Sequence, residues 1–400
     1  MKLKKKTIRD VNIKKKRLIM RVDFNVPVDE KSNVLDNTKI LGAMETIQYA
    51  LKKKAKIVLM SHMGRPKGNV LENKRLWPAG KKLQELLKKP VKILNDCVGE
   101  EVEKTVEKMK YGDIVLLENL RFHPEEEKND PEFSKKLASY GDIFVQDAFG
   151  TAHRAHASTV GITEYLPSVA GLLVDKEFTY LRMTLSAPER PFLLVLGGAK
   201  VSSKIGIIDA LLDKIDTLLI GGGMCFTFLK AMGYQVGNSL VEEDKIDLAK
   251  TIMGNAKKHN VELVLPSDFI VTDSLNPPGK PRIVDAMNLS AGDIGVDIGP
   301  RSILHFEEKI IPAKTVFWNG PMGVFETPEY SRGTFEIARY LSELNTFTVV
   351  GGGESATVVN LLNLGNKFQH VSTGGGATLK FIEGVEMPAL DVLDDLVEND

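Results

Sequence analysis

The chain has 400 residues, 43% of them hydrophobic, and its 53 Lys and Arg equal its 53 Asp and Glu in number. This length suits two domains of roughly 200 residues, each able to bury a core. Two cysteines are too few for a disulfide framework, and the longest uncharged stretch, residues 217–229, is too short to span a membrane. We therefore expect a soluble cytoplasmic protein, and we exclude membrane proteins and disulfide-rich secreted proteins.

The balanced net charge conceals an uneven distribution along the chain. Residues 1–170 contain 33 Lys and Arg against 23 Asp and Glu, whereas residues 171–400 contain 20 against 30. A cationic half suggests that this half binds an anionic partner, although clustering of surface lysines explains the same numbers.

Short apolar runs alternate with longer stretches of helical spacing along the whole chain. The runs cover residues 17–23, 56–61, 91–94, 113–118, 142–147, 192–197, 217–222, 261–266, 315–320 and 347–352. Continuous Val, Ile and Leu runs between helices predict parallel strands that are covered on both faces. Each half is therefore predicted to be a doubly wound, Rossmann-like α/β domain, and a helix over 170–186 is predicted to join the two.

The predicted strand ends of the first half carry charged and polar side chains. Ligands of open parallel sheets bind beyond these carboxyl ends. The residues there are Arg21, Asp23, Asn25, His62, Arg65, Arg121, His153, Arg154 and His156. Several cations on one edge repel each other unless an anion binds between them, so we expect a phosphate or carboxylate site.

The segment "GTAHRAHAST" (150–159) could serve a metal, a catalytic base or an anion. His153 and His156 have helical spacing, but no third ligand stands nearby in the sequence, and Arg154 between them would repel a cation. One of the histidines could still act as a base. Because an anion suits all three side chains, we assign the segment to an anion site.

The predicted strand ends of the second half are rich in glycine instead. They read "LGGAKVSSK" (196–204), "GGGMCF" (221–226), "WNGPMGVFE" (318–326), "GGGESA" (351–356) and "STGGGAT" (372–378). Glycines let backbone N–H groups approach phosphates closely. "GGGESA" matches a dinucleotide fingerprint only weakly, because no acidic residue follows at the required distance. Lys200 and Lys204, beside the first of these turns, are predicted to contact a phosphate.

The order of these motifs resembles the phosphoglycerate kinase family. The likeness runs from "RVDFNVP" (21–27) to "VSTGGGATL" (371–379) and so covers nearly the whole chain. It implies a glycolytic enzyme that transfers a phosphoryl group reversibly between 1,3-bisphosphoglycerate and ADP, with Mg²⁺, by in-line transfer after hinge-bending closure of two domains. Residues 1–170 would bind 3-phosphoglycerate or 1,3-bisphosphoglycerate, residues 171–387 would bind ADP or ATP, and residues 388–400 would pack back on the first domain.

The resemblance also implies roles for the matching positions. The acid substrate is expected to contact Asp23, Phe24, Asn25, Lys39, His62, Met63, Gly64, Arg65, Arg121 and Arg154. The nucleotide is expected to contact Lys200, Lys204, Gly295, Glu326, Gly352, Gly353, Glu354 and Ser355, with Gly295 lining the adenosine pocket. The groups expected to act in catalysis are Lys39, Lys200, Lys204 and Arg154, and Glu354 is expected to serve the metal of the nucleotide.

This reaction would need no general base, and the sequence offers no convincing one. In the ATP-consuming direction the nucleophile is a carboxylate, which is already ionised at neutral pH. Phosphoryl transfer then depends on positioning and on neutralising the charge of the moving group.

Two positions depart from the family pattern. Lys39 stands where the family has an arginine, and Glu354 stands where it usually has an aspartate. The first change replaces a planar two-pronged cation with a point charge, and the second adds a methylene beside a metal with strict geometry. Both keep the sign of the charge, so we expect an active enzyme whose rate is lowered.

Two other functions compete with the kinase. A homologue weakened by these departures could survive as a binding protein. Nucleic-acid binding could use the lysine runs at residues 4–6, 14–16 and 52–54. No aromatic residue stands among these lysines in the sequence, so we expect a solvated surface and no nucleic-acid partner. Nothing in the sequence indicates an assembly, and we expect a monomer.

Overall fold

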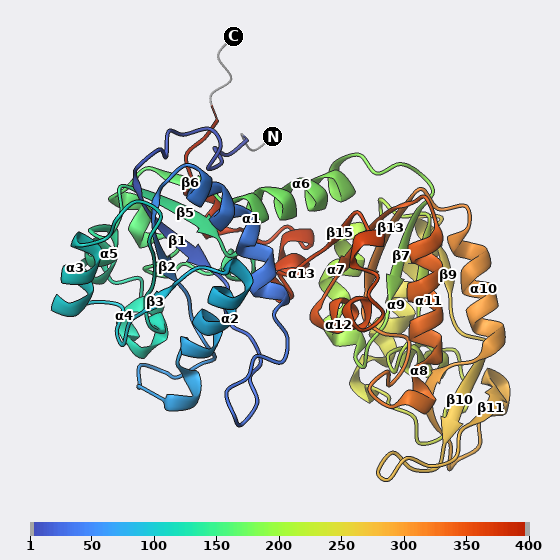
Figure 1. Ribbon diagram of the computed structural model, residues 1–400. Helices are drawn as coiled ribbons and strands as arrows, with labels where there is room; N and C mark the ends of the chain where they lie inside the picture. The colour runs from blue at the N-terminus through green and yellow to red at the C-terminus, as the bar shows by residue number, and fades with distance from the viewer. Residues whose placement is uncertain (1–3, 397–400) are drawn as a thin grey trace. The chain divides into compact units, whose positions relative to one another are not determined.

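The computed structural model describes residues 4–396, which divide into two compact units (Figure 1). Unit 1 contains the residues up to Phe178 and those from Val385 onward, and unit 2 contains Thr179–Gly384. The first boundary falls inside α6 (Leu172–Ser186), the helix that the sequence predicts over 170–186. The sequence placed the domain boundaries after residues 170 and 387.

Unit 1 is built on one parallel sheet with the strand order β3-β4-β2-β1-β5-β6. Its strands are β1 (Arg17–Val22), β2 (Lys56–Met60), β3 (Lys92–Ile93), β4 (Ile114–Leu116), β5 (Ile143–Asp147) and β6 (Ser168–Ala170). Its helices are α1 (Thr38–Lys52), α2 (Trp77–Leu87), α3 (Glu100–Glu107), α4 (Pro124–Glu127), α5 (Pro131–Ala138) and α14 (Pro388–Asp391). The five predicted runs all form strands, and β6, with three residues, is too short to show a pattern.

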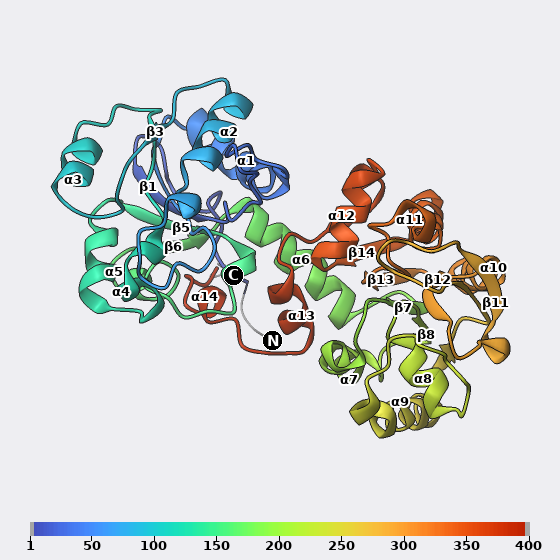
Figure 2. The same ribbon diagram turned by 90° about the horizontal axis from the view of Figure 1, so that it is seen from below.

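Unit 2 contains a second parallel sheet with the order β15-β14-β13-β7-β8-β9. Its strands are β7 (Phe192–Leu196), β8 (Thr217–Ile220), β9 (Glu262–Val264), β13 (Thr315–Asn319), β14 (Phe347–Gly351) and β15 (His370–Val371). Its helices are α7 (Ile205–Leu211), α8 (Cys225–Ala231), α9 (Ile246–Lys258), α10 (Pro300–Ile310), α11 (Arg332–Glu343), α12 (Gly353–Leu361) and α13 (Gly376–Ile382). Figure 2 shows α7, α8 and α9 on one side of this sheet and α10, α11 and α12 on the other, so both faces are covered.

The sequence missed a small antiparallel sheet in unit 2. It pairs β10 (Asp268–Thr272) with β11 (Arg282–Asp285) and with β12 (Ile294–Ile298). Exposed or half-exposed residues make up β11, and Gly295 and Asp297 interrupt the apolar pattern of β12. Neither segment therefore shows the continuous apolar run that marks a buried parallel strand.

Continuous burial explains why the predicted runs form parallel strands. Every residue of β1 after Arg17 is buried, and so is every residue of β5, β7 and β13. Strands covered by helices on both faces leave no polar side to alternate with the apolar one. A charged residue inside such a strand therefore stands out, and β1 contains one, Arg21.

The described C-terminal residues pack on unit 1. The backbone N–H of Lys6 donates to the carbonyl of Asp394 at 2.8 Å, and the N–H of Asp394 donates to the carbonyl of Ser168 at 2.9 Å. Lys5 adds an ion pair with Asp395 at 2.8 Å. Residues 397–400, part of the predicted returning segment, lie outside the described residues.

Two of the lysine runs have aromatic neighbours in the fold, although no aromatic residue stands among these lysines in the sequence. The ammonium groups of Lys15 and Lys56 lie 5.4 Å and 5.6 Å from the centre of the Tyr111 ring. The ammonium group of Lys53 lies 5.5 Å from the centre of the Tyr49 ring. Tyr111 is distant in the sequence and reaches the lysines through the turn before β4.

Every described helix is too short or too polar to cross a membrane.

Asp147 is wholly buried where β5 ends and contacts the first turn of α6. Its Oδ1 accepts hydrogen bonds from the N–H groups of Leu173 at 3.0 Å and Val174 at 3.4 Å. Its Oδ2 has no hydrogen-bond partner among the described residues. Burial raises the pKa of the Asp147 carboxyl to about 7, although the Thr46 side chain and the backbone N–H groups of Val174 and Leu173 oppose the rise.

We expect Asp147→Asn to remove a pH dependence of stability. The unfolded carboxyl ionises near pH 4, about its reference value, whereas the native carboxyl keeps its proton up to about pH 7. The unfolded state therefore binds fewer protons in this window, and the wild-type protein loses stability as the pH rises through it. Urea unfolding at pH 5 and pH 7 should show the wild type losing about 2 kcal/mol more than the variant.

Asp36→Asn provides the matched control. Asp36 is exposed and, like Asp147, accepts a backbone N–H at the start of a helix, that of Thr38 at 2.8 Å. This variant should keep the pH dependence of the wild type. An unchanged pH dependence in Asp147→Asn would contradict the assignment.

Candidate functional site

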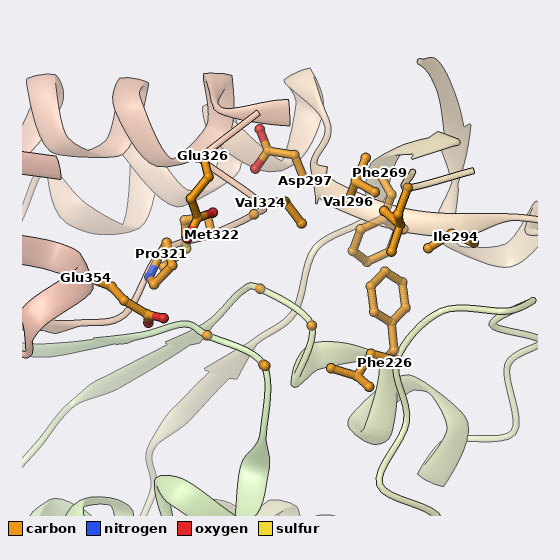
Figure 3. Close-up of a pocket in the computed structure, with 18 of the residues that line it drawn as sticks. Phe226, Phe269, Ile294, Val296, Asp297, Pro321, Met322, Val324, Glu326 and Glu354 are labelled. Atoms are coloured by element: carbon orange, nitrogen blue, oxygen red, sulfur yellow. The ribbon is translucent and has the colours of Figure 1, made fainter. Parts of the chain in front are cut away.

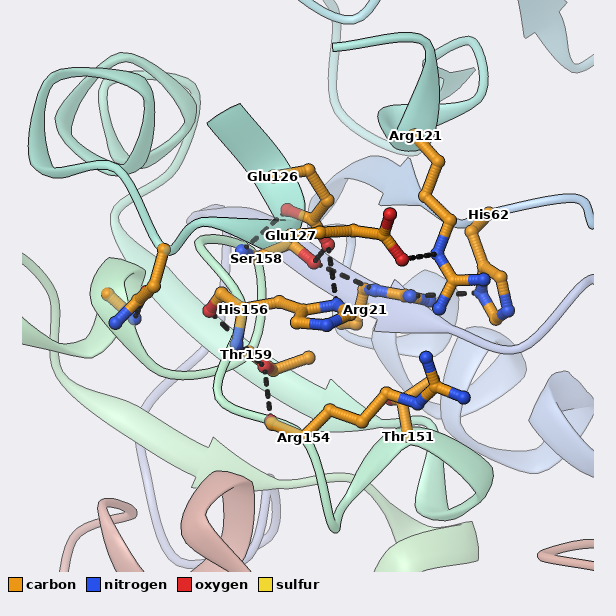
Figure 4. Close-up of polar contacts among 12 residues, drawn as sticks. Arg21, His62, Arg121, Glu126, Glu127, Thr151, Arg154, His156, Ser158 and Thr159 are labelled. Atoms are coloured by element: carbon orange, nitrogen blue, oxygen red, sulfur yellow. Dashed lines mark hydrogen bonds and ion pairs between the residues drawn. The ribbon is translucent and has the colours of Figure 1, made fainter. Parts of the chain in front are cut away.

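Arg21 lies at the centre of the polar groups of unit 1 (Figure 4). Although it is wholly buried near the end of β1, its Nε donates to Ser158 Oγ at 2.9 Å, and its Nη2 lies 3.0 Å from His62 Nδ1. Ser158 Oγ in turn donates to Glu126 Oε1 at 2.6 Å. A buried cation is thus linked through a hydroxyl to a buried carboxylate, which offsets part of the cost of removing both charges from water.

His62, immediately beyond β2, is a neutral hydrogen-bond donor. A guanidinium can only donate, so Nδ1 of His62 accepts from Arg21 and the ring proton lies on Nε2. Burial lowers the pKa of His62 well below its usual value, and four nearby cations lower it further: Arg21, Arg121, Lys39 and Arg154. These cations, which belong to four separate segments of the chain, therefore converge on one imidazole.

Arg121 presents donors that have no acceptor in the described part of the chain. It lies in a 3₁₀ turn (Leu120–Phe122) and is only 3% exposed. Its Nη1 donates to the carbonyl of Gly64 at 2.8 Å and its Nε lies 3.4 Å from Glu127 Oε1, but its Nη2 has no hydrogen-bond partner in the described chain. Burial lowers the pKa of Arg121 to about 10. Glu127 raises this pKa, whereas the positive charges of Arg154 and Arg21 lower it further. An anionic oxygen would satisfy this buried donor.

Asp23 and Lys39 form an ion pair at the same edge of the sheet. Lys39 Nζ lies 2.8 Å from Asp23 Oδ2, and the Lys39 side chain is 32% exposed. Asp23 Oδ1 accepts the N–H of Asn25 at 3.1 Å, and Asn25 Oδ1 accepts the N–H of Gly64 at 2.9 Å. These contacts hold Lys39 in a defined place in spite of its flexible side chain.

The remaining predicted substrate contacts differ in exposure. Phe24 and Met63 are buried in the core of unit 1, so their side chains serve packing. Arg154 is half-buried, and Arg65 is exposed without an ion pair in the part of the chain described. The structure therefore brings Arg121, Arg154 and Lys39 together around His62.

The prediction of an anion site that includes His156 is wrong. His156 is 8% exposed, and its Nδ1 lies 3.7 Å from Glu126 Oε1, so it faces a buried carboxylate of the protein. Burial alone would raise the pKa of Glu126, but His156, Arg21 and Ser158 outweigh this effect and hold it below its usual value. Of the three side chains in this segment, only Arg154 joins the cations near His62. Its neighbour His153 lies 3.3 Å from the Arg154 Nε.

Unit 2 contains a cavity of about 420 Å³ with one apolar end (Figure 3). The rings of Phe226 and Phe269 line that end with their centres 4.6 Å apart, together with Ile294 and Val296. Gly295 also lines it, and a Cβ there would lie 2.0 Å from the Phe226 ring. Glycine therefore lets the phenyl ring form the wall, which suits a flat apolar ligand group.

A second, glycine-walled cavity of about 250 Å³ adjoins the first. Gly352, Gly353 and Ser355 line it at the N-terminus of α12, where backbone N–H groups and the helix dipole favour an anion. Lys204, 9% exposed, also lines it and donates to Asn319 Oδ1. Burial lowers the pKa of Lys204, and the carboxylate of Glu354 opposes this.

Glu354 lines both cavities and is exposed to them, so a cation could bind its carboxylate where the two meet. Glu326 lines the larger cavity only, and Ser355 Oγ accepts the N–H of Gly320 at 2.7 Å. Lys200 is exposed and does not line either cavity. The predicted nucleotide residues thus gather here, except for Lys200.

Sequence reasoning missed the aromatic end of the larger cavity. Phe226 belongs to the motif "GGGMCF", which was noticed only for its glycines. Phe269 and Asp297 lie on the antiparallel strands that the sequence did not reveal. Asn319, at the end of β13, stands in the motif "WNGPMGVFE", but nothing in that motif indicated that it accepts from Lys204.

Three comparisons with known proteins agree. The sequence profile described as Phosphoglycerate kinase matches residues 8–385. The phosphoglycerate kinase of Dictyoglomus turgidum is 53% identical over 98% of this chain and 99% of its own length, and that of Pelotomaculum thermopropionicum is 51% identical over 97% and 99%. The structure of phosphoglycerate kinase from Coxiella burnetii, 36% identical, superposes with a TM-score of 0.86 over 97% of this chain and 98% of the other. With a profile match and a 53% identical relative that both span nearly all of it, the chain belongs to the phosphoglycerate kinase family.

Proposed function

We propose that this protein is a working phosphoglycerate kinase that transfers a phosphoryl group between 1,3-bisphosphoglycerate and ADP, giving 3-phosphoglycerate and ATP. The observation that carries the proposal is the convergence of four cations on the neutral His62, beside a buried N–H group of Arg121 that has no acceptor among residues 4–396. Within this family, such a site suits the phosphate and carboxylate of the acid substrate.

In unit 1, the acid substrate would be the anion that these cations bind. Arg121 and Arg154 would donate to its phosphate or carboxylate oxygens, and the Nε2–H of His62 would add a neutral donor. Lys39, held by Asp23, would neutralise the charge at the reacting carboxylate. No proton has to be removed, because that carboxylate is already ionised at neutral pH.

In unit 2, the nucleotide would place its base in the apolar cavity beside Phe226 and Gly295. Its phosphates would lie in the glycine-walled cavity, where Lys204 and the N-terminus of α12 offer donors. Lys200, exposed on the turn after β7, lines neither cavity and would have to move toward the phosphates to contact them.

The residues present suit a Mg²⁺ ion bound with the nucleotide. Glu354 lines both cavities, and a carboxylate together with phosphate oxygens is the ligand set that Mg²⁺ prefers. When bound, the ion would neutralise phosphate charge. The placement of the protein in the cytoplasm as a monomer stays a prediction.

The function is tested by the initial rate with Mg-ATP and 3-phosphoglycerate, followed as ADP release. A turnover of at least about 1 s⁻¹ would support the kinase. Binding of both ligands without turnover would favour the rival function, in which the protein is a homologue that survives as a binding protein. The reason to consider this function is that Lys39 and Glu354 depart from the family pattern.

Lys204→Ala should lower kcat by about 100-fold or more, because one buried, preorganised cation would be lost from the phosphate cavity. The matched control is Lys258→Ala, which removes an exposed lysine at the end of α9 and should leave kcat unchanged. Both variants should keep the wild-type far-ultraviolet circular dichroism. Near-normal turnover of Lys204→Ala would remove this residue from the mechanism.

Lys39→Arg should keep turnover or raise it by up to about tenfold, since a guanidinium offers two parallel donors where an ammonium offers a point charge. Lys39→Ala should nearly abolish turnover and leave Asp23 without its partner. Measured kcat and KM separate a catalytic role from a packing role. An active Lys39→Ala enzyme would show that this lysine is not needed.

Direct transfer requires the two units to bring their ligands together, because the acid site belongs to one unit and the nucleotide site to the other. Small-angle scattering should therefore give a smaller radius of gyration with both ligands bound than with either alone. An unchanged radius in the ternary complex would argue against closure.

A further inference from the structure

A group of three different metal-ligating side chains lies in unit 1 outside both candidate sites. Asp96 and Cys97 follow β3, and His123 lies between the 3₁₀ turn of Arg121 and α4. One ligand atom of each lies within 4.8 Å of the others. We propose that Asp96, Cys97 and His123 bind a divalent cation of the zinc type, and no assignment made above uses these side chains.

The geometry needs little change to accept the ion. His123 Nε2 is 2.7 Å from Asp96 Oδ1, and the backbone N–H of Cys97 donates to the same oxygen at 2.6 Å. A tetrahedral Zn²⁺ with bonds of about 2.0–2.3 Å separates its ligand atoms by about 3.3–3.7 Å. The oxygen and the nitrogen would therefore part by about half an ångström to admit the ion, and the sulfur already lies within 4.8 Å of both.

The ligands are already oriented. The ring of His123 stacks on Phe133 with centres 5.5 Å apart, which limits its rotation. Cys97 is wholly buried, whereas the Asp96 side chain is 54% exposed and that of His123 is 28% exposed. An ion could thus enter from solvent past Asp96 and reach the thiol, and water would complete the tetrahedral set.

The surroundings of the thiol favour a cation. The carboxyl groups of Asp96, Glu126 and Glu118 all act electrostatically on the Cys97 thiol. Arg75 pairs with Glu118, and Arg21 reaches Glu126 through Ser158, whereas no arginine or lysine of residues 4–396 forms an ion pair with Asp96. When the sulfur–metal bond forms, the thiol proton leaves to solvent and the thiolate and Asp96 balance the ion.

The ligand set selects the kind of metal. A thiolate and an imidazole suit Zn²⁺ or Co²⁺, whereas Mg²⁺ takes oxygen ligands. This site would therefore not compete for the Mg²⁺ of the nucleotide. An ion here would join the loop after β3 to the segment that carries Arg121 and so would stabilise unit 1, because the unfolded chain does not hold the three ligands together.

The test is a titration of the full-length protein, reduced and freed of metal by a chelator, with Co²⁺ as the spectroscopic probe. We expect one ion per chain, with tetrahedral d–d bands and a thiolate-to-cobalt charge-transfer band that Zn²⁺ abolishes by displacement. Zn²⁺ at a 100-fold excess over its Kd should raise Tm by about 5 °C or more.

Variants identify the ligands. Cys97→Ser should abolish the charge-transfer band, and His123→Asn should weaken Co²⁺ binding at least tenfold. Because the His123 side chain is partly exposed, His123→Asn tests the site even if loss of the buried Cys97 thiol prevents folding. The matched control, Cys225→Ser, removes the other buried cysteine and should leave the spectrum unchanged. A wild-type spectrum without a charge-transfer band, or equal binding by His123→Asn, would overturn the proposal.

Discussion

The buried charge of Arg21 is the constraint on which the polar side of unit 1 depends. A guanidinium inside a parallel strand has to be paired and hydrogen-bonded, because an isolated buried charge is very costly. Its partners come from distant segments: His62 after β2, and Ser158 with Glu126. Satisfying this one cation therefore brings the end of β1 together with three other parts of the chain.

A consequence of that network is the state of His62. Burial, and after it the charges of Arg21 and the other cations nearby, keep the ring neutral, so it can donate but is unsuited to act as a positively charged group. The positive charge of the site therefore rests on arginine and lysine, which hold their protons at any physiological pH. This division suits a reaction in which charge has to be neutralised and no proton removed.

In unit 2 the requirement differs, because this unit has to leave two cavities open for a ligand. At Gly295 the absence of a side chain lets the Phe226 ring form the wall of the cavity. Gly352, with φ of +90°, allows the chain to turn from β14 into α12, so that the helix N-terminus faces the second cavity. Lys204 is then the buried cation at that cavity, and Asn319 and Glu354 stabilise its charge.

The sequence by itself determined the α/β class and the edge of each sheet that carries polar residues, because burial on both faces imposes continuous apolar runs and parallel strands end on one side. Only the tertiary structure decided which of those polar residues face the candidate site and which pair with other protein groups. His156 faces Glu126, 30 positions earlier, and Tyr111 lies beside Lys15, which has no aromatic residue near it in the sequence. β11 and β12 were equally hidden, because short segments with exposed or half-exposed residues bear no local pattern, and Phe269 lies on β10, the strand between them. Such pairings depend on which segments the fold brings together, and spacing along the chain does not record them.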